Sequence, residues 1–231
     1  MDLARLIDHT LLKPEATEAD IRRLVDEAIE HRFASVCVNG RWVELAAKLL
    51  RDARADQGDR AVKVCAVVGF PLGAAKGTVK SMEAVAAIKD GAGEIDMVVS
   101  LGLLLEGKED KVRDEIAHLV KTSRLARADV LVKVILETAA LNEEQIAAGC
   151  RAAKSAGADF VKTSTGFHSK GGATVQAVRW LAQCAPGLGV KASGGLNDRA
   201  IAEAMIAAGA TRLGTSSGVA IVRGMSSAAA Y

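Results

Sequence analysis

The chain has 231 residues, of which 50% are hydrophobic and 25% are charged, a balance typical of a globular protein and too apolar for a disordered one. Its 30 lysines and arginines nearly balance 28 aspartates and glutamates, so the net charge of +2 indicates neither a nucleic-acid partner nor a membrane-surface partner. The sequence has no signal-peptide pattern and no apolar stretch near the roughly 18 residues of a membrane span. Its four cysteines lack CxxC spacing, so we expect free thiols in a cytoplasmic protein.

Short β-branched segments alternate with longer alanine-rich segments along the whole chain. The predicted strands cover residues 7–12, 34–38, 62–68, 94–99, 131–136, 160–164, 190–193 and 212–215. Between them, apolar residues recur at i, i+3, i+4 and i+7, the spacing of helices that lie on a sheet. Eight such units without a linker predict an α/β fold, a (β/α)8 barrel forming one domain over residues 1–231, with a short flexible tail at about 224–231. An open doubly wound sheet is the alternative, because periodicity does not distinguish an open sheet from a closed one.

Four predicted strands carry an ionisable residue inside an otherwise apolar stretch. A parallel strand that is covered on both faces is normally apolar throughout, whereas inward side chains at the C-terminal ends of barrel strands form active sites. Lys162 and Lys191 are followed directly by small polar loops, so we expect both at this functional end. Asp96 and Lys133 lie in neighbouring predicted strands. Lys63, in contrast, opens its strand and is expected to reach solvent.

Two ammonium groups inside one barrel have a chemical consequence. At about 5 Å, with an effective dielectric constant near 20, their repulsion is about 3 kcal/mol, and desolvation acts in the same direction. One lysine is therefore expected to be neutral near neutral pH, and a neutral amine attacks carbonyl groups. The pattern predicts a Schiff-base lysine with a charged helper, and Asp96 is the candidate proton shuttle.

Small residues follow the last three predicted strands. Backbone N–H groups can approach an anion closely where side chains are small, and barrels often bind phosphate in their last loops. Plain turn chemistry is the alternative explanation for these glycines and serines. The predicted phosphate- or substrate-binding residues are Gly166, Gly194, Gly195, Ser216 and Ser217.

The four histidines show no pairwise ligand spacing, so the sequence predicts no metal site. We also expect no organic cofactor, because a Schiff-base lysine supplies its own electrophile once it has condensed with the substrate.

Nine segments resemble the deoxyribose-phosphate aldolases, class I Schiff-base aldolases with a TIM-barrel fold, and together they extend over nearly the whole chain. They read LIDHTLLKPEAT, SVCVN, VVGFPLGA, EIDMVV, VKVILET, FVKTSTGF, GGAT, VKASGG and GTSSG. The resemblance implies a metal-independent lyase that reversibly cleaves 2-deoxy-D-ribose 5-phosphate to D-glyceraldehyde 3-phosphate and acetaldehyde, in cytoplasmic deoxyribonucleotide and carbohydrate catabolism. It implies that Lys162 forms the imine, that Lys191 is the second lysine and that Asp96 is the acid/base carboxylate.

Two further residues are auxiliary candidates. Lys133 lies in the VKVILET segment, and Tyr231 is the only tyrosine and the last residue. In some relatives a terminal tyrosine assists protonation of the enamine, and this resemblance implies that the tail here folds over the pocket. A disordered terminus without a catalytic role is the alternative. We expect small sugar-phosphate and aldehyde substrates, no nucleic acid, no membrane, and a homo-oligomer, either a dimer or a tetramer.

The sequence departs from the family pattern at a few positions outside the predicted catalytic residues. Ser100 stands where asparagine is frequent, Asn197 where arginine is frequent, and Gly40-Arg41 where proline and a small or aromatic residue are common. These departures concern the phosphate affinity and the range of acceptor aldehydes. Two other functions remain open from the sequence: a Schiff-base aldolase with a ketone donor, and a non-catalytic barrel that binds sugar phosphates.

Overall fold

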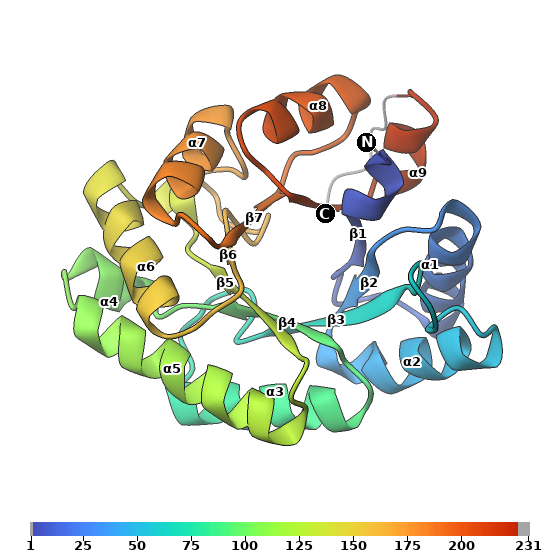
Figure 1. Ribbon diagram of the computed structural model, residues 1–231, viewed down its shortest axis with the longest axis horizontal. Helices are drawn as coiled ribbons and strands as arrows, with labels where there is room; N and C mark the ends of the chain where they lie inside the picture. The colour runs from blue at the N-terminus through green and yellow to red at the C-terminus, as the bar shows by residue number, and fades with distance from the viewer. Residues whose placement is uncertain (1, 226–231) are drawn as a thin grey trace.

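A computed structural model describes residues 2–225, and in this range eight parallel strands alternate with helices in chain order. The strands are β1 Ile7–Leu11, β2 Ser35–Val38, β3 Lys63–Val68, β4 Glu94–Val98, β5 Leu131–Ile135, β6 Phe160–Lys162, β7 Gly189–Ser193 and β8 Arg212–Thr215. Each strand pairs with the next, and β1 also pairs with β8 through Ile7↔Leu213 and His9↔Thr215. The sheet is therefore closed (Figure 1). This closure confirms the predicted (β/α)8 barrel and rules out the open doubly wound sheet.

The helices form a ring outside the strands (Figure 1). They are α1 Glu18–His31, α2 Val43–Asp52, α3 Gly77–Lys89, α4 Leu101–Leu105, α5 Glu109–Ala126, α6 Glu143–Ser155, α7 Val175–Cys184, α8 Arg199–Ala207 and α9 Gly218–Val222, with short 3-10 helices at Leu3–Leu6, Gly40–Trp42 and Thr138–Ala140. Helix α1 begins with a capping box in which Thr17 and Asp20 satisfy each other's backbone N–H groups, and Asn142 and Gln145 do the same for α6. No helix within the described residues is long and apolar enough to cross a bilayer.

Predicted and observed strands agree within one or two residues. The largest difference is at β6, predicted over 160–164 and observed over Phe160–Lys162. Thr163 still pairs through its backbone, donating to the Lys191 carbonyl at 3.0 Å and accepting from the Thr138 N–H at 2.8 Å, but side chains take over part of the pairing beyond Lys162. The Thr163 hydroxyl accepts from the Ser193 N–H at 3.0 Å, and the Thr165 N–H donates to the Glu137 carboxylate at 3.3 Å.

Little of the predicted tail can be compared with the structure. Gly224 and Met225 lie in a turn after α9, which the Met225 N–H closes by donating to the Ala220 carbonyl at 2.8 Å. The rest of the tail, including Tyr231, lies outside the described residues.

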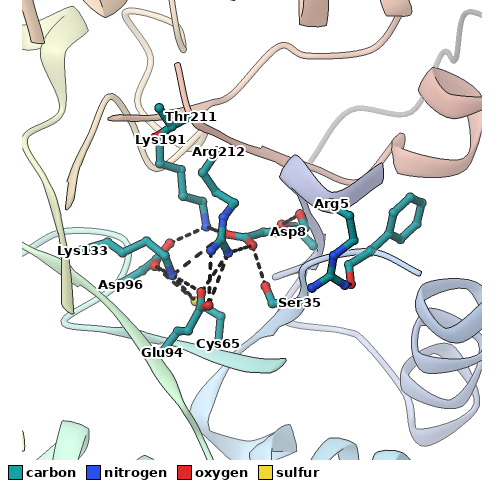
Figure 2. A network of polar contacts seen from close by, with 12 residues as sticks. Arg5, Asp8, Ser35, Cys65, Glu94, Asp96, Lys133, Lys191, Thr211 and Arg212 are labelled. Atoms are coloured by element: carbon teal, nitrogen blue, oxygen red, sulfur yellow. Dashed lines mark hydrogen bonds and ion pairs between the residues drawn. The ribbon is translucent and has the colours of Figure 1, made fainter. Parts of the chain in front are cut away.

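Apolar and charged side chains are separated by the wall of the barrel. The main hydrophobic core, which includes Phe33, Ile116 and Leu181, lies between the strands and the helices. The space inside the strands instead holds a network of buried charged side chains (Figure 2). Because ionisable groups are buried only when they are paired, this network requires a partner for each of its members.

Candidate active site

The three residues predicted to be catalytic lie together inside the barrel. Strands β6 and β7 place Lys162 and Lys191 directly opposite each other in the parallel register. Both ammonium nitrogens contact the same oxygen of Asp96, Oδ2, at 2.8 Å for Lys162 and 2.7 Å for Lys191. Asp96 reaches this point from β4, and all three side chains are buried. Residues far apart in the sequence therefore meet at one carboxylate oxygen.

The second oxygen of Asp96 also has partners. Oδ1 lies 2.9 Å from the Lys133 Nζ and accepts from the Cys65 thiol at 3.1 Å. Figure 2 shows Asp96 between Lys133 and Lys191. Burial alone would raise the pKa of Asp96, but the ammonium groups of Lys133, Lys162 and Lys191 hold this pKa well below its usual value. Asp96 is therefore ionised at neutral pH in the resting protein.

The two facing lysines differ in how well their charges are compensated. Lys191 contacts a second carboxylate, with its Nζ 2.5 Å from Asp8 Oδ2. Burial lowers the pKa of Lys191, but Asp8 and Asp96 outweigh it and hold the pKa well above its usual value. Among the described residues, Lys162 has an ion pair with Asp96 alone, through the oxygen that it shares with Lys191. Lys162 is thus the ammonium group that the network stabilises least.

A further layer of charge lies beneath these residues (Figure 2). Arg212 bridges two carboxylates, with its Nη1 2.6 Å from Asp8 and 3.0 Å from Glu94. Glu94 also lies 2.6 Å from the Lys133 Nζ. Within the described residues the network sets four cationic side chains against three carboxylates, namely Lys133, Lys162, Lys191 and Arg212 against Asp8, Glu94 and Asp96.

Sequence reasoning missed Asp8, Glu94 and Arg212, although each had a signal. Glu94 stands two residues before Asp96 and so shares its face of β4. Asp8 lies inside the LIDHTLL segment, and Arg212 is in register with Lys191 on β8. Lys63 at the start of β3 is exposed, as expected from the sequence, whereas Asp8 and Glu94 are buried and Arg212 is half-buried near the starts of their strands.

The predicted phosphate-binding residues lie in the loops that follow β6, β7 and β8, at the C-terminal mouth of the barrel. Gly194 has φ +92°, and a Cβ there would lie 2.9 Å from the Cα of Gly172 and 3.2 Å from the Cα of Gly166, so the loops after β6 and β7 touch. Ser217 is buried, and within the described residues its hydroxyl has no hydrogen-bond partner. Ser216, beside it, is half-buried.

A cavity of about 210 Å³ opens at the same mouth, beside Lys162 rather than around it. Its lining residues are Pro71, Leu72, Val98, Leu101, Glu137, Thr165, Phe167 and His168. Glu137, which sequence reasoning also missed, is buried and accepts from the Thr165 hydroxyl at 2.5 Å. Phe70 and Phe167 meet edge to face with their ring centroids 5.2 Å apart. The loop that follows Lys162 is therefore held by Phe70, which follows β3, and by Glu137, which follows β5.

Two sets of potential metal ligands also lie in the network. The first set is Cys37, Cys65 and Asp96, and the second is Asp8, Cys65 and Glu94. Within each set the donor atoms lie within 4.8 Å of one another. The carboxylates of both sets already bind ammonium or guanidinium groups, so the arrangement favours internal ion pairs over a bound cation. All four cysteines are free thiols, and only Cys184 is not fully buried.

Residues 3–226 match the DeoC/LacD family of aldolases. The chain belongs to this family. It is 52% identical over 225 residues to a deoxyribose-phosphate aldolase of Enterococcus faecalis, covering 97% of each chain. Over 230 residues it is also 52% identical to one of Halalkalibacterium halodurans, covering 99% of this chain and 98% of the relative.

Solved structures of proteins named deoxyribose-phosphate aldolase have the same barrel. A deoxyribose phosphate aldolase of Aeropyrum pernix, described as tetrameric, superimposes with a TM-score of 0.86 at 37% identity, covering 96% of this chain and 89% of that chain. A protein of Coccidioides immitis described as a deoxyribose-phosphate aldolase superimposes with a TM-score of 0.88 at 40% identity, covering 96% and 85%. The predicted family and fold are thereby confirmed.

Proposed function

We propose that this aldolase reversibly cleaves 2-deoxy-D-ribose 5-phosphate to D-glyceraldehyde 3-phosphate and acetaldehyde. The observation that carries the proposal is the shared contact of Lys162 and Lys191 with one oxygen of Asp96. Lys162 is the last residue of β6, as expected, whereas Lys191 lies in the middle of β7 rather than at its end. The near full-length identity to proteins named deoxyribose-phosphate aldolase supports the choice of substrate.

The reaction begins with Lys162. Its neutral amine attacks the C1 aldehyde of the open-chain sugar, and loss of water leaves an iminium ion. Lys191 stays positive between Asp8 and Asp96, and its charge disfavours the protonated form of Lys162. In this proposal Lys162 is the nucleophile because it is the least compensated amine of the network.

The iminium ion then accepts the electrons of the carbon–carbon bond. A base removes the proton of the C3 hydroxyl, the C2–C3 bond breaks, and C3 becomes the aldehyde of glyceraldehyde 3-phosphate. The electron pair of the broken bond forms the enamine between C1 and C2. Protonation of C2 and hydrolysis of the resulting imine release acetaldehyde and free Lys162. We assign the proton transfers to Asp96 acting through bound water, with Lys191 as the ammonium donor that Asp96 holds in place.

The phosphate end of the substrate fits the loops after β6, β7 and β8. Gly166, Gly194 and Gly195 all have positive φ, and glycines in this conformation allow an anion to approach the backbone N–H groups closely. The buried hydroxyl of Ser217 is a further donor, and Ser216 stands next to it. These five residues form the proposed phosphate site.

A borohydride trap tests the assignment of the imine. After incubation with acetaldehyde and reduction, we expect one peptide, the one that contains Lys162, to gain the mass of an ethyl group. Lys162→Arg keeps the positive charge beside Asp96 but should abolish both the adduct and the cleavage of deoxyribose phosphate. Lys63→Met, which changes an exposed lysine at the start of β3, is the matched control and should leave both unchanged.

The same assay separates the rival functions. An adduct on Lys191 or Lys133 would reverse the assignment of the nucleophile. Activity with dihydroxyacetone but not with acetaldehyde would indicate a ketone-donor aldolase, and substrate binding without an adduct or turnover would indicate a sugar-phosphate-binding barrel.

Three further expectations complete the proposal. We propose that Tyr231 donates the proton to the enamine carbon, and Tyr231→Phe should slow exchange of the acetaldehyde methyl protons with deuterated water by roughly 10²-fold.

We propose a homo-oligomer, consistent with the tetramer described for the Aeropyrum pernix relative, and light scattering measures its size. Free thiols support a cytoplasmic location, which fractionation of the source cells tests.

A further inference from the structure

A second buried ion pair lies outside the catalytic network, between the helix ring and the end of β4. Lys80 on α3 is fully buried, and its Nζ lies 2.8 Å from Glu115 Oε1 on α5. The Glu115 side chain is 7% exposed. Removing one partner of such a pair is costly, whereas apolar replacement of both is often neutral, so stability alone does not explain why a protein keeps it.

Both members of the pair bind the backbone that leaves β4. Lys80 Nζ donates to the Val98 carbonyl at 2.8 Å and to the Ser100 hydroxyl at 3.3 Å. Glu115 accepts from the Ser100 N–H at 3.0 Å and from the Ser100 hydroxyl at 2.8 Å. The last residue of β4 and the residue that caps α4 are therefore fixed by α3 and α5.

The end of β4 needs this support because it extends beyond its pairing with β3. The β3–β4 ladder runs only as far as Val68↔Met97, so Val98 lies beyond the register pairs with β3. The Lys80 ammonium supplies the donor that its carbonyl needs. Gly69, the first residue after β3, leaves room for the Lys80 side chain, since a Cβ there would lie 3.0 Å from its Cε.

Asp96 stands two residues before Val98 on the same strand, and side chains two residues apart share one face. A tilt of the end of β4 would therefore move the carboxylate that contacts Lys162, Lys191 and Lys133. We propose that Lys80, Glu115 and Ser100 form a positioning clasp that holds Asp96 at its distance from Lys162. The clasp rests on the proposed function, in which Asp96 organises the imine chemistry, and it gives a role to Ser100, one of the departures from the family pattern.

The clasp is tested by measuring kcat for cleavage of deoxyribose phosphate, normalised to the fraction of active sites that form the acetaldehyde adduct. Lys80→Met removes the charge but keeps the length of the side chain. We expect kcat to fall about 10- to 100-fold with KM within about twofold, because substrate-binding loops are untouched while the reacting groups are misplaced. The rate of borohydride trapping with acetaldehyde should fall in parallel, although the final trapped fraction should equal that of the wild type. Arg113→Met, which removes exposed ion pairs of α5, is the control and should change nothing.

Two further variants separate positioning from stability. The double variant Lys80→Met, Glu115→Met leaves no unpaired buried charge, so its Tm should recover while kcat stays low. Ser100→Ala, the mildest change, should lower kcat about three- to tenfold, and Ser100→Thr, which keeps the hydroxyl, should restore it.

The outcomes decide between this proposal and the proposed function itself. Here kcat is divided by the fraction of sites that borohydride traps. If Lys80→Met and the double variant have the kcat of the wild type, the clasp is overturned. If those two variants do not fold, a wild-type kcat in Ser100→Ala overturns it. A low kcat in Ser100→Ala with recovery in Ser100→Thr would support it even in that case. If the wild-type protein forms no adduct and cleaves no deoxyribose phosphate, it is the proposed function that fails.

Discussion

At the scale of single residues, the neighbours of a lysine decide its chemistry in this barrel. Lys63 opens β3 and is exposed, Lys133 contacts Glu94 and Asp96, and Lys191 contacts Asp8 and Asp96. Lys162 contacts one oxygen that already serves Lys191. The same side-chain type is therefore a solvated charge at one position, a fixed cation at two others and, in our proposal, a nucleophile at the fourth.

Lys191→Leu tests this dependence on neighbours. Without the Lys191 charge, Asp96 is less compensated and attracts the Lys162 ammonium more strongly. The acid limb of the pH profile of kcat/KM should move up by about one to two pH units, the equivalent of about 1.4 to 2.7 kcal/mol, with activity at pH 7 at least 10-fold lower. The limb is measured with deoxyribose phosphate between pH 5 and 10 at constant ionic strength. An unchanged limb would show that Lys191 does not act through its charge.

At the scale of elements, the active site depends on loops that touch each other as well as on strands. The loop after β7 contacts the loop after β6 at Gly194, where there is no space for a side chain. The cavity beside Lys162 is lined by the loops after β3 and β6 and by the ends of β4 and β5. The loops after β6 and β7 thus form one packed layer over the strand ends.

Gly194→Ala tests that contact, and Gly171→Ala, in the loop after β6 but outside the proposed phosphate site, is its matched control. Both glycines have positive φ, so each substitution carries a similar backbone strain of about 1 kcal/mol, but a Cβ at Gly171 meets nothing within 4 Å. We expect Gly194→Ala alone to separate the two loops and to raise KM for deoxyribose phosphate about 10-fold or more. The comparison with unphosphorylated deoxyribose isolates the effect on phosphate binding. Equal KM values in the two variants would argue against loop packing as the cause.

At the scale of the whole molecule, the charged network gives the stability of the fold a defined pH dependence. Salt-bridge partners outweigh burial and lower the pKa of Asp8 and Asp96 below the usual 3.8, while they raise that of Lys133 and Lys191 above the usual 10.5. A carboxylate with a lowered pKa stabilises the fold above its unfolded value and loses this contribution as the pH falls toward the folded value. A lysine with a raised pKa stabilises the fold below its unfolded value and loses this contribution as the pH rises through the folded value.

The free energy of unfolding should therefore contain a network contribution that is constant between about pH 4 and pH 10.5 and that falls outside this range. Urea denaturation followed by circular dichroism at a series of pH values measures it. Asp52→Asn, which removes an exposed ion pair with Lys48, should leave the profile unchanged. A network contribution that already declined between pH 7 and pH 5 would contradict the lowered pKa values of Asp8 and Asp96.

Much of the fold and of the candidate site was predictable from local sequence. Strand and helix periodicity gave eight units, and buried lysines before glycine-bearing loops singled out Lys162 and Lys191, because a charge inside an apolar strand needs a partner or a function. The layer beneath them was not predictable in the same way. Arg212 opens β8 and Glu94 opens β4, and only the closed barrel brings them within 3.0 Å of each other.

The sequence by itself determined the order and type of the elements, because these follow from alternation, helical spacing and turn chemistry over short ranges. It also singled out Asp96, Lys133, Lys162 and Lys191 as charged residues inside apolar strands. The tertiary structure alone decided how the charges are shared. The closing pair β1–β8 brings Asp8 within reach of Lys191 and Arg212, the strand register sets Lys162 opposite Lys191, and β4 places Asp96 between them. Coulomb interactions depend on distances between atoms that lie up to 204 positions apart in the chain. Which lysine is the least compensated is therefore a property of the closed barrel.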